Sequence, residues 1–477
     1  MLHYKDSPVL ASEAVIRKEA GVTVEIGPPR IVAAKDELPD EGNCIGPGLE
    51  RFGKTIYLNW SFDGDVVDAD RPSKPNGRVS HDGGLTWKKQ TLLMPQGTKY
   101  QTGEREITCW NSAFEIPGKP GVYKIPTWRS SDLGQTWTGH TWTTVEYPGT
   151  KGLDRYDPPE EYRKKDGNYL RGGVKSVPPA YLESFFREVS RLRPFVHYSG
   201  LWPQATDAEG TLYSMVFARY LKDTSGIRDW DREYWQRLNW YRYAVLMQVS
   251  RDNGRTWTFA GVPVDGSDYE PRLGIKPGGS MYNENSFVVN PDNQIGAGFK
   301  GRVDFCPGDG FSEPSLVMFP DGEMLCALRA GSNKPLYCVR SYDRGRTWTR
   351  AELLSPRYIH PICGVLPKLV LLKNGILALC TGRPDCTVHF SKDRGRTWFL
   401  SETLFATPSI RWDGVYSGSH QNNSMIAVDD NTLLYVHDAT RPDPSAPNAW
   451  LQHAGHGLII TRRIQIKSDN SNIGETR

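Results

Sequence analysis

Residues 391–398 read SKDRGRTW, and the pattern S-x-D-x-G-x-T-W occurs at four earlier places in the chain. The five copies are SHDGGLTW (80–87), SSDLGQTW (130–137), SRDNGRTW (250–257), SYDRGRTW (341–348) and SKDRGRTW (391–398). In each copy the aspartate can accept backbone N–H groups, the glycine permits a positive φ, and the tryptophan can bury a large ring. The pattern therefore predicts a recurring turn with a structural role, which we name the box turn.

The spacing of the box turns predicts the fold. Their aspartates are separated by 50, 120, 91 and 50 residues, so the basic unit has about 50 residues and the longer intervals contain insertions. Apolar runs joined by DAEG, PDG and KNG precede the later box turns and are typical of hairpins. A hairpin followed by two strands that a box turn joins is a four-stranded propeller blade. The sequence thus predicts an all-β protein, a six-bladed β-propeller of four-stranded antiparallel blades.

The predicted blades divide one domain that spans residues 1–477. They cover about 43–90, 108–140, 195–258, 311–350, 364–400 and 418–466, and the strand at 22–33 is expected to close the ring by joining the last blade. Insertions are expected at 150–194, 221–243 and 260–310, and the last of these leaves a seventh blade open as the alternative. Apolar residues at helical spacing predict a short helix at 178–195.

Composition limits the partners and the location. Lys and Arg total 58 against 55 Asp and Glu, a balance that indicates neither nucleic acid nor a membrane surface as the main partner. No apolar run suits a signal peptide or a membrane span, so a cytoplasmic location is expected, although a secreted chain without its leader would look the same. The eight cysteines lack CxxC spacing, so neither a metal site nor a cofactor is predicted. The oligomeric state stays open.

Hairpin geometry indicates where a functional site would lie. In an up-and-down blade the first turn and the box turn share one end, so the first strand begins and the second strand ends at the opposite end, which we name the mouth. Glu313 and Arg329 each lie eight residues from Asp321 in the fourth hairpin, which predicts that they face each other at the mouth. Arg383 occupies the corresponding strand end in the fifth blade. Planar guanidinium groups at such positions suit two-point binding of a carboxylate.

The five box turns resemble the Asp-box repeats of the sialidase (neuraminidase) superfamily over residues of about 40–465. The resemblance of the fourth blade to the family's E-P-S strand start, followed by a strand-end arginine, implies roles for three residues. Glu313 would activate the nucleophile, and Arg329 and Arg383 would bind a substrate carboxylate.

Two family positions differ in this chain. Ile45 stands where the resemblance implies another arginine, and Arg30 would have to approach from elsewhere in the chain to replace it. Asn422 stands where the family has its tyrosine nucleophile, and Tyr416 or His420 would have to replace it.

Further candidates lie at predicted strand ends. A general acid is expected from the first blade, where Asp63, Asp65, Asp68 and Asp70 follow the second strand, and Asp65 or Asp63 is favoured by its proximity to the strand end. Arg219, Trp110 and Trp202 are candidates for substrate binding, although each alone also suits packing.

The sequence supports three functional hypotheses. The first is an exo-acting glycoside hydrolase that acts on an oligosaccharide or glycan with a terminal acidic sugar. The second is a polysaccharide lyase or uronate-linked glycosidase, in which an arginine neutralises a uronate carboxylate and His420 or Tyr416 transfers a proton. The third is a non-catalytic glycan-binding propeller.

Overall fold

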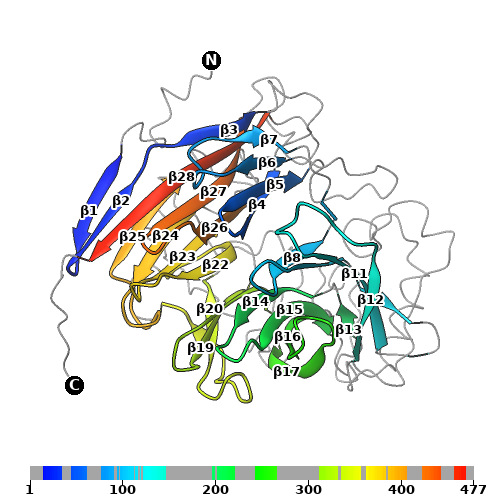
Figure 1. Ribbon diagram of the computed structural model, residues 1–477. Helices are drawn as coiled ribbons and strands as arrows, with labels where there is room; N and C mark the ends of the chain where they lie inside the picture. Colours follow the sequence, from blue (N-terminus) through cyan, green and yellow to red (C-terminus); the bar gives the residue numbers. More distant parts are fainter. Residues whose placement is uncertain are drawn as a thin grey trace, which may run out of the picture.

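A computed structural model describes residues 14–34, 45–61, 77–90, 94–95, 97–111, 113–116, 119, 122–146, 196–198, 201–220, 242–265, 311–330, 335–355, 361–382, 385–405, 422–441 and 456–468. In this part of the chain the strands form six antiparallel sheets, arranged as the blades of a propeller (Figure 1). The predicted all-β, six-bladed fold is confirmed. The helix expected at 178–195 and most of the segment that left a seventh blade open, 266–310, lie outside the described residues.

Each sheet is built mainly from strands that follow one another in sequence. The first blade contains β4 (Ile45–Phe52), β5 (Thr55–Ser61), β6 (Gly77–Ser80) and β7 (Lys88–Lys89). The second contains β8 (Thr98–Gln101), β9 (Ile107–Trp110), β11 (Val122–Ser130) and β12 (Thr141–Glu146), with the short β10 (Phe114–Glu115) beside β11. The third contains β13 (Val196–Tyr198) and β14 (Pro203–Thr206), both paired with β15 (Leu212–Tyr220), followed by β16 (Arg242–Ser250) and β17 (Thr258–Asp265).

The remaining blades follow the same order. The fourth contains β18 (Ser312–Met318), β19 (Met324–Arg329), β20 (Tyr337–Ser341) and β21 (Glu352–Leu353). The fifth contains β22 (Val365–Leu371), β23 (Leu377–Gly382), β24 (Cys386–Ser391) and β25 (Leu400–Phe405). The sixth contains β26 (Asn423–Ala427), β27 (Thr432–Arg441) and β28 (His456–Ser468), completed by β1 (Val15–Glu19), β2 (Val22–Ile26) and β3 (Arg30–Ala34).

The sixth sheet joins the two ends of the described chain. The long strand β28 pairs with β27 on one side and with both β2 and β3 on the other (Figure 1). Val22, Val24 and Ile26 of β2 are buried against the fifth blade. Hydrogen bonds between β2, β3 and β28 therefore close the ring without leaving β28 as an unpaired edge.

The second blade begins earlier than residue 108, where the sequence placed it. Its first strand is β8, which pairs with β9 from Thr98 to Gln101. The segment TKYQ shows no apolar run because this inner strand carries Lys99, which forms an ion pair with Glu50 of the first blade. The hydrophobic pattern therefore marks only the second strand of this hairpin.

The box turns have the same hydrogen bonds in all five blades. In the first, the Asp82 carboxylate accepts the Thr86 N–H at 2.9 Å and the Thr86 hydroxyl at 2.6 Å, while the Ser80 hydroxyl oxygen accepts the Gly84 N–H at 2.9 Å. The glycine of each box has a φ between 75° and 87°. At Gly254 an added Cβ would lie 2.4 Å from the ring of Trp110, so the third box turn packs directly on the second blade.

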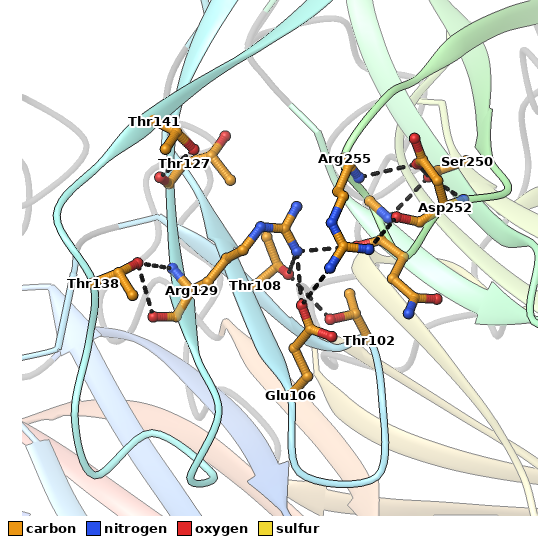
Figure 2. Close-up of polar contacts among 12 residues, drawn as sticks. Thr102, Glu106, Thr108, Thr127, Arg129, Thr138, Thr141, Ser250, Asp252 and Arg255 are labelled. Atoms are coloured by element: carbon orange, nitrogen blue, oxygen red, sulfur yellow. Dashed lines mark hydrogen bonds and ion pairs between the residues drawn. The ribbon is translucent and has the colours of Figure 1, made fainter.

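The variable positions of the third, fourth and fifth box turns contain arginines that join neighbouring blades. Figure 2 shows Glu106, in the hairpin turn of the second blade, between Arg129 of its own blade at 3.0 Å and Arg255 of the third box turn at 3.8 Å. Glu323 occupies the equivalent turn of the fourth blade. The box turns and the hairpin turns thus lie at one end of the propeller and connect adjacent blades by ion pairs.

The box aspartates predict how stability depends on pH. Hydrogen bonds from Thr136 and Thr347 lower the pKa of Asp132 and Asp343 from 3.8 to about 2. Because the folded state favours the ionised carboxylates, their contribution is complete above about pH 4 and is lost as the pH falls through about 2. We expect an Asp132→Asn, Asp343→Asn double variant to have a lower melting temperature than the wild type at pH 7. Between pH 4 and pH 2, the melting temperature of the double variant should decrease by less than that of the wild type.

Circular dichroism during thermal unfolding, recorded across this pH range, measures both effects. Asp430→Asn is a suitable control because Asp430 is an exposed partner of Lys373 outside the box turns. If the melting temperatures of the double variant and the wild type decrease by the same amount between pH 4 and pH 2, the carboxylates of the box turns do not cause the loss of stability in acid.

Candidate functional site

Four inner strands begin with an X-Pro pair at the mouth. These pairs are Gly46-Pro47, Trp202-Pro203, Glu313-Pro314 and Leu366-Pro367, and in each case the strand pairing shifts register beside the proline. The residue before proline has a φ of 64° at Gly46, 48° at Glu313 and 47° at Leu366. A positive φ at Glu and Leu is strained, and such strain is concentrated at functional sites.

Glu313 and Arg329 meet at the mouth of the fourth blade. An Oε1 atom of Glu313 accepts a hydrogen bond from Nη1 of Arg329, and Oε2 accepts the backbone N–H of Leu366 at 2.7 Å. The two side chains are 15% and 18% exposed, so solvent reaches a pair that is otherwise enclosed. The carboxylate therefore fixes the guanidinium and ties the fourth blade to the fifth.

Trp202 directly precedes β14, the neighbouring inner strand. Two residues further on, Gln204 receives the N–H of Leu316 at 2.6 Å and donates to the carbonyl of Pro314 at 2.9 Å. These bonds hold the first strand of the third blade against that of the fourth. Trp202 is only partly buried, and its backbone N–H donates to the Ser214 hydroxyl at 2.8 Å. Its side chain packs against the core cluster that contains Trp110 and Leu201.

Asp438 is a buried acid at the mouth that the sequence patterns did not single out. It ends the hairpin of the sixth blade, is fully buried, and accepts the N–H groups of Gly46 at 2.8 Å and Asn422 at 3.2 Å. The bond to Gly46 joins the sixth blade to the first. Asp438 thus has the same geometric function there as Glu313 has between the fourth and fifth blades. An acid at the end of the apolar run LLYVHD was the available sequence signal.

Charged side chains also line the inner strands below the mouth. Lys99 of β8 and Glu50 of β4 form an ion pair at 3.4 Å. Burial lowers the pKa of Lys368 on β22, which interacts electrostatically with Glu50, and burial raises the pKa of Glu50. These three charged side chains therefore interact with one another across the first, second and fifth blades.

Trp110 occupies a packing position. Its side chain is 1% exposed, lies edge-on to Trp257 with ring centroids 5.6 Å apart, and touches Gly254 of the third box turn. A ring enclosed in this way has no face available for a sugar. The strong apolar character of strand β9 explains the position, because ITCW is buried at all four residues.

Arg30, suggested as a substitute for the arginine missing at Ile45, points elsewhere. Its Nη1 donates to the carbonyl of Leu85 in the first box turn at 2.9 Å. This contact lies at the end of the blades that carries the box turns. Arg30 therefore does not add to the pair at the mouth.

Several predicted site residues are not placed by the structure. Arg383, Asp63, Asp65, Tyr416 and His420 lie outside the described residues. The backbone of Arg219 belongs to β15, where it pairs with His197 and Tyr243, and its side chain is not among those described. Of the predicted set, the structure brings Glu313 and Arg329 into contact.

The chemistry available to the described residues is that of carboxylates and guanidinium groups. Burial raises the pKa of Cys363, which precedes β22 near the mouth, to about 12, so its thiol is not a nucleophile at neutral pH. The described residues contain no group of three or more His, Cys, Asp and Glu side chains placed to hold a metal ion. Nor does this part of the chain contain a helix of the length and hydropathy that a membrane crossing requires.

Comparisons with known proteins concern the fold. No protein-family model and no curated protein matches the chain. A protein of unknown function from Dyadobacter fermentans is similar in structure, with 14% identity, a TM-score of 0.54, and coverage of 93% of this chain and 99% of that one.

Two glycoside hydrolases are more distant in structure. An α-L-arabinanase from Penicillium chrysogenum has 14% identity, a TM-score of 0.44, and coverage of 89% of this chain and 93% of that one. A Trypanosoma rangeli sialidase has 11% identity, a TM-score of 0.45, and coverage of 88% of this chain and 53% of that one. Identities this low concern the fold alone. The six blades, with box turns at one end and the Glu313–Arg329 pair at the other, form the propeller that the resemblance to the sialidase superfamily implied.

Proposed function

We propose that this protein is an exo-acting glycoside hydrolase that removes a terminal acidic sugar, sialic-acid-like or uronate, from a glycan. The supporting observation is the partly exposed Glu313–Arg329 pair at the mouth. A guanidinium has five N–H donors in a planar fork, and Glu313 orients this fork through Nη1 of Arg329. Such a group suits a substrate carboxylate.

Hydrolysis would break the glycosidic C–O bond. The leaving oxygen would take a proton from a general acid, for which Asp65 or Asp63 is our candidate, and water would supply the hydroxyl that joins the anomeric carbon. Arg383 would complete the carboxylate clamp, and Tyr416 or His420 would act with Glu313 at the anomeric carbon. Trp202 and Arg219 would contact the sugar at the third blade.

A non-catalytic protein that binds acidic glycans is the second candidate. It is favoured by the contacts of Glu313, whose two oxygens already accept hydrogen bonds from Arg329 and Leu366. A carboxylate whose two oxygens both accept hydrogen bonds holds its donors in position. One of these hydrogen bonds must break before the carboxylate can accept a proton.

Product analysis tests the proposal. Incubation with a panel of sialosides and uronate-containing oligosaccharides is expected to release the terminal acidic sugar as a reducing sugar without new ultraviolet absorbance. An unsaturated, ultraviolet-absorbing uronate would instead indicate a lyase, and binding without products would indicate the second candidate. Glu313→Gln should abolish turnover, while Glu209→Gln, at an exposed pair with Arg344, should retain it. Wild-type turnover by Glu313→Gln and by Arg329→Ala would show that the site is misplaced.

A further inference from the structure

The sixth blade contains a buried arginine with no carboxylate partner among the described residues. Arg462 of β28 is 3% exposed, and its Nη1 donates to the carbonyl of Gly27 at 3.1 Å. Its Nε is also buried and has no hydrogen-bond acceptor. The groups that act on it electrostatically are the phenol of Tyr435 and the imidazole of His437. Arg462 therefore differs from Arg340, an equally buried arginine that contacts Glu323 at 3.1 Å.

The neighbours of Arg462 also have unsatisfied polar atoms. Tyr435 lies directly opposite Arg462 in the pairing of β27 with β28 and is fully buried, and its hydroxyl has only the thiol of Cys386, a weak hydrogen-bonding group, as a neighbouring polar partner. His437 follows on the same face, with its ring centroid 5.7 Å from that of Tyr435 and 5.2 Å from that of Phe405. Its Nδ1 donates to the Asp438 carbonyl at 3.0 Å, so Nε2 of the neutral ring is an acceptor, and it too is unsatisfied.

These polar groups lie in the apolar layer between the fifth and sixth blades. Ile460 and Ile464 flank Arg462 on its own strand, and both belong to the core cluster that includes Phe390 and Phe405 of the fifth blade. Burial lowers the pKa of Arg462 to about 10, so the guanidinium stays charged at neutral pH. A buried charge without a counter-charge is strongly unfavourable, and water satisfies hydrogen bonds without supplying one.

We propose that Arg462 and Tyr435 bind one small monovalent anion of the chloride class between the fifth and sixth blades. The Nε–H of Arg462 and the hydroxyl of Tyr435 are the two donors, and the anion supplies the missing charge. A monatomic anion suits a packed layer better than a larger oxyanion. Since Arg462 also binds Gly27, between β2 and β3, the site lies at the seam that closes the ring (Figure 1). Anion binding therefore stabilises the closed propeller.

Thermal unfolding in a series of sodium salts at constant ionic strength tests the proposal. Replacing gluconate with chloride or bromide is expected to raise the melting temperature of the wild type in a saturable manner. Arg462→Met should remove this rise and, in gluconate, should melt at the wild-type temperature or above, because the buried charge is gone. Tyr435→Phe keeps the ring but removes one donor, so it should weaken the apparent bromide affinity by roughly tenfold.

Two further measurements separate the site from general salt effects. Arg344→Met removes an exposed arginine and should keep the wild-type halide response. Crystals grown in bromide should show an anomalous peak within hydrogen-bond distance of Arg462 Nε. The proposal is overturned if the halide response does not saturate, if it persists in Arg462→Met, or if the crystals show water but no bromide at this position. If Arg462→Met does not fold, Tyr435→Phe and the bromide crystals decide the question.

Discussion

Replacing Glu323 with glutamine is expected to lower the free energy of unfolding by about 3–5 kcal/mol. Glu323 is almost fully buried in the hairpin turn of the fourth blade. Its carboxylate contacts Arg340 at 3.1 Å, Arg394 at 2.6 Å and Arg396 at 2.9 Å, and the last two belong to the fifth box turn. Glutamine has nearly the same volume but no charge, so the buried guanidinium of Arg340 would lose its counter-charge.

Urea denaturation of the wild type and the variant measures this effect. Glu209→Gln is the matched control, because Glu209 occupies the hairpin turn of the third blade and pairs with Arg344 of the next box turn at 3.1 Å, but both side chains are at least half exposed. Water and salt screen that pair, so its loss should change stability far less. Equal urea midpoints for the two variants would mean that burial does not increase the contribution of these ion pairs between blades to stability.

The fold was predictable because each box turn is a local structure. Its serine, aspartate, glycine and threonine form hydrogen bonds with one another within eight residues, so the turn can be predicted without knowing the rest of the chain. The arginines at the variable positions were not predictable as links between blades. Arg255 and Arg396 look like solvated turn residues in sequence, and only the closed ring brings Glu106 and Glu323 to them.

The same distinction applies to the mouth. Glu313 and Arg329 were predictable as a pair because counting outward from a hairpin turn is also a local argument. Asp438 was not, since its bond to Gly46 joins residues 392 positions apart and depends on which blades are neighbours. The role of Trp110 could not be decided from the sequence, because a tryptophan at a strand end fits both a sugar-binding surface and a core. The contact with Gly254 that places it in the core comes from the next blade.

Under the proposed function, replacing Arg329 with lysine is expected to remove most of the preference for an acidic substrate. Lysine keeps the positive charge but loses the planar fork that Glu313 orients, so two-point binding of a carboxylate fails. On the best acidic glycoside of the panel, we expect kcat/KM to fall by roughly a hundred- to a thousandfold. On the methyl ester of the same glycoside, which lacks the charge, the variant and the wild type should differ little. If Arg329 only supported the fold, the substitution would lower kcat/KM on the acid and on the ester equally and would also lower the melting temperature. An equal loss on acid and ester would therefore assign a structural role to Arg329, and another residue would bind the substrate carboxylate.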